Sequence, residues 1–160
     1  MVESTTAHKQ GPSAHDARGP LAQRLLAPET FPALTADACA LVEKEIKKRG
    51  MTMRTAYGVA LKVKPDLVTR TVTELMPGFV AELEPCYAVF QNSGSIDLRA
   101  HFIANAETVA DAMLSVADRR AQRIHSRAIS SGYKRVRGRA RREIIDTMPQ
   151  IADVLARHAN

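Results

Sequence analysis

The sequence holds only two cysteines, and this scarcity excludes several small-protein architectures. Cys39 and Cys86 lie 47 residues apart, and no Cys-x-x-Cys spacing occurs in the 160 residues. A disulfide framework or a zinc ribbon needs more cysteines at closer spacing, so neither is predicted. Both cysteines have apolar neighbours in the sequence, which is typical of small core residues in a reducing compartment.

Long hydrophobic runs are absent as well. The apolar stretches fall far short of the roughly 18 residues that cross a bilayer, so no membrane span is predicted. The first twenty residues carry Glu3, Lys9, Asp16 and Arg18 without an apolar block, a pattern that excludes a secretory signal peptide. These absences predict a cytoplasmic protein.

The motifs of common enzymes are also absent. The sequence has no glycine-rich phosphate cradle, no Gly-x-Ser-x-Gly elbow and no Glu-x-x-His pair for a di-iron bundle. His101 and Asn105 share a helix face without a third ligand, and Glu107, Asp111 and Asp118 could line a face without sharing a desolvated site. The sequence therefore assigns no catalytic residue, no metal ligand and no cofactor, and it favours an enzyme least among the function classes considered.

What the sequence does contain is typical of one folded domain. It is 45% hydrophobic and 25% charged, which is ordinary for a globular protein. Residues 1–19 are polar and lack periodicity, so they are predicted to be a disordered tail. From residue 20 to residue 160 no window alternates between apolar and polar residues, and no sheet is predicted. We expect a single all-α domain built as a compact multi-helix bundle.

Apolar residues spaced three and four apart indicate where the first helices lie. They predict helices over about 35–49 and 52–64, and a third that begins at Pro65, where the missing N–H of proline costs nothing. After Pro85 the pattern predicts a short apolar turn and a loop, and Ser95 or Asp97 is expected to begin the next helical region.

The second half of the chain shows two further apolar stripes. One runs from Phe102 to Ala128 without interruption, and Ser130-Ser131-Gly132 is predicted to break the helix that carries it. The last stripe begins at Tyr133 and reaches Leu155.

A dipeptide recurs and suggests an internal duplication. Met76-Pro77 is echoed by Met148-Pro149, 72 residues later, and apolar positions around the two pairs correspond. We interpret the domain as two pseudo-repeats of about three helices each, over residues 30–85 and 100–158. Because proline removes a helical hydrogen bond, a kink or a restart is expected near each Met-Pro pair.

Several short motifs stand at core positions and helix breaks. They are Ala56-Tyr57-Gly58-Val59, Val63-Lys64-Pro65, Leu75-Met76-Pro77-Gly78-Phe79, Leu83-Glu84-Pro85, Gly132-Tyr133-Lys134-Arg135-Val136-Arg137-Gly138, Met148-Pro149 and Arg157-His158-Ala159. Together they resemble a domain-of-unknown-function family of small helical proteins from high-GC Gram-positive bacteria, over about residues 21–159. The resemblance implies a helical cytoplasmic domain of bacterial origin and supplies no catalytic residues. The dense Arg139-Ala-Arg-Arg run departs from the family pattern.

Acidic residues are missing from one stretch of the chain, residues 119–142. This stretch holds ten basic residues, whereas the rest of the chain holds 13 basic and 17 acidic residues. The ten form the predicted polyanion-binding surface: Arg119, Arg120, Arg123, Arg127, Lys134, Arg135, Arg137, Arg139, Arg141 and Arg142. Like charges this dense repel one another, so a counter-charge is expected.

The sequence leaves open what neutralises these charges. One interpretation is ordinary ion pairing with acidic residues elsewhere in the fold. Another is a polyanion, nucleic acid first, because guanidinium groups bind phosphate bidentately. An anionic membrane ranks lower, since Ile124 and Ile129 are the available bulky apolar residues and are expected in the core. Tyr133 is the one aromatic residue of the stretch, which argues against a base-stacking surface. The alternative function is a protein-protein scaffold or a self-associating domain that uses an apolar groove.

Overall fold

Eight helices make up the part of the chain that the structure describes. The computed structural model describes residues 19–160, so the predicted tail, apart from Gly19, lies outside it. The helices are α1 (Pro20–Leu25), α2 (Phe31–Lys47), α3 (Met51–Val63), α4 (Leu67–Asn92), α5 (Leu98–Ala104), α6 (Ala106–Gln122), α7 (Arg127–Asp146) and α8 (Met148–Ala159). No strand occurs between residues 19 and 160, which confirms the prediction of an all-α fold.

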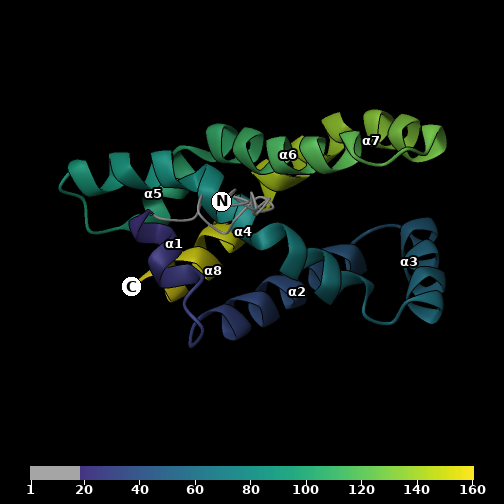
Figure 1. Cartoon of the computed structure of the whole chain (residues 1–160), viewed down its shortest axis with the longest axis horizontal. Helices are drawn as coiled ribbons and strands as arrows, with labels where there is room; N and C mark the ends of the chain where they lie inside the picture. Colours follow the sequence, from purple (N-terminus) through teal and green to yellow (C-terminus); the bar gives the residue numbers. More distant parts are fainter. Residues whose placement is uncertain (1–18) are drawn as a thin grey trace, which may run out of the picture.

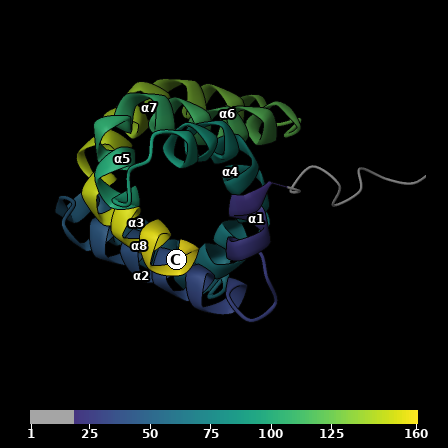
Figure 2. The ribbon, with the colours of Figure 1, turned by 90° about the vertical axis from the view of Figure 1, so that its left-hand side faces the viewer.

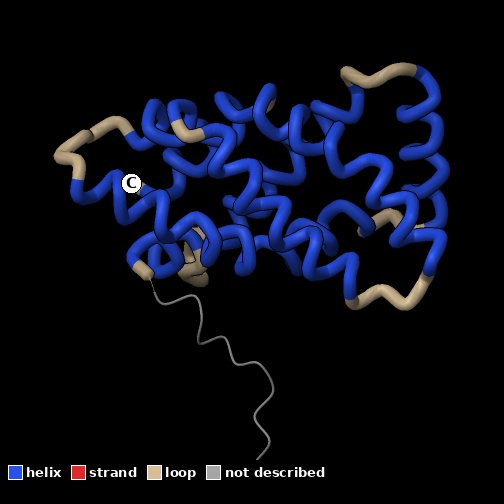
Figure 3. The backbone as a smooth tube through the Cα atoms, turned by 90° about the horizontal axis from the view of Figure 1, so that it is seen from above, coloured by secondary structure: helices blue, strands red, loops and turns tan. Residues whose placement is uncertain are grey.

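The helices form an elongated body with different elements at its two ends. Figure 1 shows α1, α5 and the end of α8 at one end of the long axis and α3 at the other. Viewed along that axis, the helices surround a common centre (Figure 2). Short loops join them, as the tube in Figure 3 shows from above. The fold therefore brings α8, at the end of the chain, against α1, α2 and α5.

The densest core belongs to the end that holds α1, α5 and α8. Its largest fully buried side chains come from α1, α2, α4, α5, α6 and α8. They are Leu21, Leu25, Leu34, Val80, Leu83, Phe102, Val109 and Met148. By contrast, α3 contributes no buried residue and packs mainly against α2. Burial of apolar area is the main stabilising term, so the fold is stabilised chiefly at the end opposite α3.

The short helix α1 depends on a tertiary contact for its N-terminal cap. Glu84, on α4, accepts hydrogen bonds from the backbone N–H groups of Ala22 at 2.7 Å and Leu21 at 3.4 Å. A carboxylate at this position satisfies unpaired N–H groups and complements the helix dipole. A Cβ on Gly19 would lie 2.1 Å from Cδ of Glu84. Glycine at this position therefore allows the carboxylate to reach the helix.

The predicted turn directly after Pro85 is wrong, because α4 continues to Asn92, and the predicted loop follows at residues 93–97. Both of its prolines, Pro77 and Pro85, lie inside the helix and are solvent-exposed. A proline removes one backbone hydrogen bond one turn back. On an exposed face, water can satisfy the carbonyl that this leaves free.

Two further boundary predictions are also wrong. The stripe from Phe102 to Ala128 is not one helix, because α5 ends before Asn105, whose side-chain amide donates to the carbonyl of His101 at 2.8 Å. The predicted break at Ser130-Ser131-Gly132 does not occur, since α7 runs through it. Glycine costs about 1 kcal/mol in a helix, and the packing of α7 on α6 outweighs that cost.

The two Met-Pro pairs lie in different surroundings. Met148 begins α8 after a break at Thr147, so the predicted restart occurs at this pair. Met76 lies inside α4, and the helix continues past it. The duplication itself stays a prediction.

Candidate functional site

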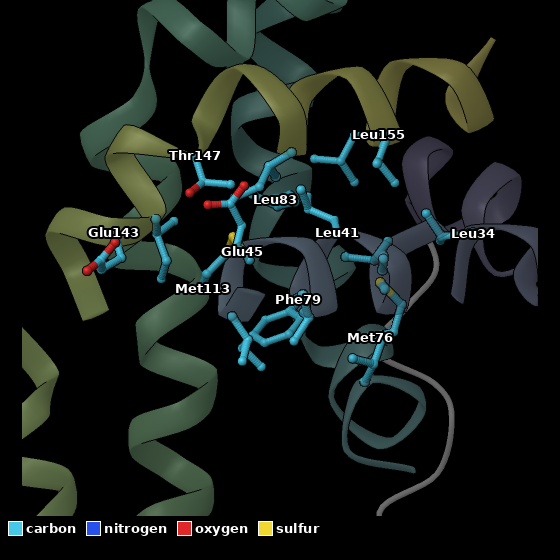
Figure 4. A pocket seen from close by; sticks show the side chains of 18 of the residues that line it. Leu34, Leu41, Glu45, Met76, Phe79, Leu83, Met113, Glu143, Thr147 and Leu155 are labelled. Carbon is cyan, nitrogen blue, oxygen red and sulfur yellow. The ribbon is translucent and has the colours of Figure 1, made fainter. Parts of the chain in front are cut away.

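A mostly apolar hollow lies between α2, α4 and α8, with further contributions from α3, α6 and α7. Its volume is about 380 Å³, and sixteen of its twenty lining residues are apolar. Figure 4 shows side chains from several helices pointing into it, among them Phe79, Met113 and Leu155. Small-molecule sites in proteins are typically of about 300–1,000 Å³ and mostly apolar. This apolar cavity is the candidate functional site.

Helical periodicity explains how α2 lines the cavity along its whole length. Its lining residues begin at Leu34 and continue at Ala38, Leu41 and Val42, with two more residues that end at Ile46, and Arg49 lines the cavity just beyond the end of α2. These positions repeat every three or four residues and so share one helix face. At 1.5 Å per residue the face, from Leu34 to Ile46, extends over about 18 Å. The cavity is therefore an elongated groove that follows α2.

The polar lining residues are grouped at one end of the cavity. Arg49 forms an ion pair with Glu143 of α7, and its Nε donates to the backbone carbonyl of Glu45 at 3.4 Å. The Glu45 carboxylate accepts from Lys48 Nζ at 2.7 Å. In Figure 4, Thr147 and Glu45 lie near one another, far from Leu34 at the apolar end. The cavity thus has an apolar body and a polar end whose charges are already paired.

An apolar hollow of this size lowers the stability of the fold considerably if it is empty. Cavities in protein cores cost about 24 cal/mol per Å³, so an enclosed void of 380 Å³ would cost on the order of 9 kcal/mol. That figure is as large as the whole stability of a typical domain. This cavity is partly open, and Val42 on its wall is 37% exposed. Solvent or a ligand must therefore fill it.

The predicted basic surface divides into two groups in the structure. Five of its ten cations pair with carboxylates on other turns or helices. The pairs are Arg119–Glu82 at 2.6 Å, Arg120–Glu74 at 2.5 Å, Arg137–Asp118 at 2.8 Å, Arg139–Glu143 at 3.4 Å and Arg141–Asp111 at 2.7 Å. The ion-pairing interpretation therefore holds for half of the surface.

The other five cations have no carboxylate within ion-pair distance in residues 19–160. They are Arg123, Arg127, Lys134, Arg135 and Arg142, and all five are exposed. Arg123 and Arg127 flank the turn between α6 and α7, and Lys134 and Arg135 lie about two turns into α7. The unpaired charge is thus concentrated near that turn.

The ion pairs between α6 and α7 change the acidity of the groups involved. Asp118 accepts from Nε and Nη2 of Arg137, both at 2.8 Å, and from the Tyr133 hydroxyl at 2.6 Å. The bonds from Arg137 lower the pKa of Asp118, and Arg141 lowers the pKa of Asp111. Burial, together with the bond to Asp118, raises the pKa of Tyr133 to about 12. The acidic face considered for catalysis consists of carboxylates that are ion-paired to α7.

A cysteine and a histidine meet in the fold, which sequence spacing did not reveal. His101 Nε2 lies 3.5 Å from Cys86 Sγ and 3.0 Å from the Cys86 carbonyl oxygen. Burial raises the pKa of the Cys86 thiol, whereas a nucleophilic cysteine needs a lowered one. The His101 ring packs beside Phe90 and Phe102. This pair is arranged as part of the core.

Sequence reasoning did not identify the apolar cavity because its residues belong to the same stripes as the core. Leu83 and Leu155 line the cavity and are also buried in the hydrophobic core. A clue was available in Glu45, which interrupts the apolar face of α2 near its end, and in Arg49, which follows that end. The side chains considered for catalysis, His101, Glu107 and Asp111, lie outside the cavity lining.

Comparisons with known proteins place the chain in a family. Residues 21–159 match the model of a family of unknown function, DUF6918. This match confirms the resemblance that the sequence motifs indicated, at the level of the family. No curated protein and no solved structure matches the chain. None of the helices in the described residues is both apolar and long enough to span a bilayer.

Proposed function

Because this chain belongs to DUF6918, whose function is unknown, we propose a function from the geometry: the protein is a non-catalytic binding protein that holds a long-chain apolar molecule in the cavity between α2, α4 and α8. The observation that carries the proposal is the 380 Å³ cavity, apolar along its length and polar at one end. Core packing normally leaves few voids larger than a water molecule, so the cavity is a feature that the fold maintains.

The shape and polarity of the cavity indicate the chemical class of the ligand. A face of about 18 Å along α2 suits an extended hydrocarbon chain. The polar end consists of Arg49 paired with Glu143 and of Glu45 paired with Lys48. A charged head group would leave one of these partners without its counter-charge, which is costly. The ligand that fits is a long-chain molecule with a small uncharged polar head, such as an alcohol or an ester.

The test compares three ligands that share one hydrocarbon chain. Binding of hexadecanol, palmitate and hexadecylamine is measured by displacement of a fluorescent apolar probe. We expect hexadecanol to bind most tightly. Ala38→Leu is expected to weaken binding about tenfold, which corresponds to roughly two lost buried methylenes at about 0.8 kcal/mol each.

Ala40→Leu is the matched control, since Ala40 is exposed on the same helix and does not line the cavity. It should bind hexadecanol as the wild type does. Equal weakening by both variants, or no binding of any of the three ligands, would reject the proposal. A stable dimer in light scattering that Ala38→Leu disrupts would indicate instead that a second copy occupies the cavity.

A second candidate function is contact with a polyanion, nucleic acid first, through the surface predicted from the sequence. The five cations without a carboxylate partner in the described residues support it. If all five contacted phosphates of duplex DNA, raising the salt from about 50 to 200 mM would weaken binding roughly 500-fold.

A mobility-shift titration tests this candidate with two variants of equal charge change. Arg127→Gln with Arg135→Gln removes unpaired cations, and Arg119→Gln with Arg120→Gln removes paired ones. The first variant should lose more affinity for DNA than the second. Equal losses, or no binding by the wild type at low salt, would count against the candidate.

A further inference from the structure

One end of the molecule combines exposed apolar side chains with unpaired cations. Figures 1 and 3 show α3 and the turn between α6 and α7 at the same end of the long axis. We infer that this end docks on an anionic lipid surface. The inference goes beyond the proposed cavity function. It uses the same unpaired cations as the second candidate function, but it assigns them an anionic membrane in place of a nucleic acid.

The first support is an apolar stripe on α3 that faces solvent. Met51 is 82% exposed, Val59 is 57% exposed and Val63 is 75% exposed. These positions are separated by eight and four residues, so they share one helix face. The opposite face of α3, which includes Tyr57 and Leu61, is less exposed. The helix therefore presents a second apolar face that the fold does not use.

The second support is the charge around this stripe. Residues 50–66 contain one acidic residue, Asp66, and three cations, Arg54, Lys62 and Lys64, which are exposed and form no ion pair with a described carboxylate. Helices with an apolar face flanked by lysine and arginine lie in membrane interfaces, where they meet anionic lipids. A duplex nucleic acid would match the cations but would leave the apolar stripe exposed to water.

The third support is a polar hollow at the turn between α6 and α7. It has a volume of about 390 Å³, and its lining includes Ile124, Arg127, Ser131 and Lys134. Ile124, which the sequence placed in the core, is 38% exposed. Arg127 and Lys134 belong to the unpaired cations. Guanidinium, ammonium and hydroxyl groups are the donors that a phosphate accepts from, so the hollow suits the phosphate of a lipid headgroup at the same end of the molecule as the apolar stripe.

Exposure alone does not identify such a surface, as Ile96 demonstrates. It is 99% exposed in the turn before α5, but its neighbours in sequence are Ser95 and Asp97, and the nearby Arg99 is paired with Asp153. The end with α3 differs because apolar side chains and unpaired cations occur there together. The polar end of the cavity lies toward it, since Met53 of α3 lines the cavity together with Arg49.

Vesicle co-sedimentation of the full chain tests the inference. We use phosphatidylcholine vesicles with and without phosphatidylglycerol. We expect binding that requires phosphatidylglycerol and weakens as salt is raised. Arg127→Gln with Lys134→Gln should weaken binding about 25-fold, or about fivefold per cation. Val59→Ser with Val63→Ser should weaken it about tenfold.

The control variant, Ile96→Ser with Arg99→Gln, removes one apolar residue and one cation at the opposite end and should bind as the wild type does. Circular dichroism verifies that each variant is folded. If the wild type binds no vesicle, or if the α3 variant binds vesicles as tightly as the wild type, the inference is wrong. If the protein binds duplex DNA but no vesicles, the inference is wrong and the second candidate function is favoured. If Ala38→Leu loses hexadecanol binding but binds vesicles normally, that loss belongs to the cavity and the inference about the lipid surface stands.

Discussion

At the scale of single residues, buried polar groups differ in whether the fold supplies them with a partner. The Tyr133 hydroxyl donates to Asp118 at 2.6 Å. The Tyr57 hydroxyl is buried and has no hydrogen-bond partner among residues 19–160. A hydrogen bond contributes about 1 kcal/mol, whereas a buried group without one carries an unrecovered desolvation cost. The two tyrosines are therefore expected to respond in opposite directions when the hydroxyl is removed.

We predict that Tyr133→Phe lowers the free energy of unfolding at neutral pH by about 1 kcal/mol, because it removes the bond to Asp118. Tyr57→Phe is the control and should leave stability unchanged or raise it. Urea unfolding followed by circular dichroism measures both. Destabilisation by the two variants alike would contradict the prediction.

Burial of Tyr133, together with its bond to Asp118, makes stability depend on alkaline pH. Folding raises the pKa of Tyr133 from its ordinary value of about 10 to about 12. A raised pKa of this kind contributes stability fully below pH 10, and the contribution is lost as the pH rises through 12. The difference between wild type and Tyr133→Phe should therefore shrink over that interval. Unfolding curves at several pH values measure it, and a constant difference would argue against the bond.

At the scale of helices, a glycine determines how closely α4 approaches α6. A Cβ at Gly78 would lie 2.8 Å from Cγ1 of Val116, which is closer than real Cβ contacts. Elsewhere in a helix, alanine is more stable than glycine by about 1 kcal/mol. Whether replacing a glycine by alanine stabilises or destabilises the protein thus depends on whether a neighbouring helix fills the space.

We predict that Gly78→Ala destabilises the protein by about 1–3 kcal/mol through overpacking. Adding Val116→Ala should recover part of the loss by removing the clashing methyl groups. Gly138→Ala is the control, because a Cβ at Gly138 would meet no heavy atom of another described element within 4 Å, and it should stabilise α7. Thermal unfolding of the four proteins measures these effects. If Gly78→Ala were as stable as the wild type, the approach of α4 to α6 would be looser than described.

At the scale of the whole molecule, stability is unevenly distributed along the long axis. The core near α1, α5 and α8 includes Phe102, whose side chain is fully buried. At the other end, Val63 is 75% exposed. This distribution leaves the end with α3 free to meet a partner without a large loss of folding free energy.

We predict that Phe102→Ala lowers the free energy of unfolding by roughly 3–5 kcal/mol, whereas Val63→Ala changes it by less than about 0.5 kcal/mol. Denaturant unfolding at equilibrium measures both. Comparable losses from the two variants would show that α3 is as tightly integrated as the core.

The sequence alone predicted the parts of this structure that depend on local pattern. Apolar residues three and four apart determined the all-α class and the approximate position of α3, because burial of one helix face requires that spacing. It also predicted Asp97 or Ser95 as the start of a helix, and Asp97 caps α5 by accepting from the Ala100 N–H. The boundaries at Pro85 and Gly132 could not be predicted, since tertiary packing offset the local cost of proline and glycine.

The tertiary structure alone decided the features that join distant segments. Sequence identified ten clustered cations, but only the packing of α7 on α6 and of α6 on α4 determined which four of them meet carboxylates on another helix. The apolar cavity arises because the stripes of α2, α4 and α8 do not close on one another, and a stripe that lines a cavity has the same spacing as one that fills a core. Local periodicity specifies which face is apolar, whereas the distances between helices depend on the volumes of side chains far apart in the chain.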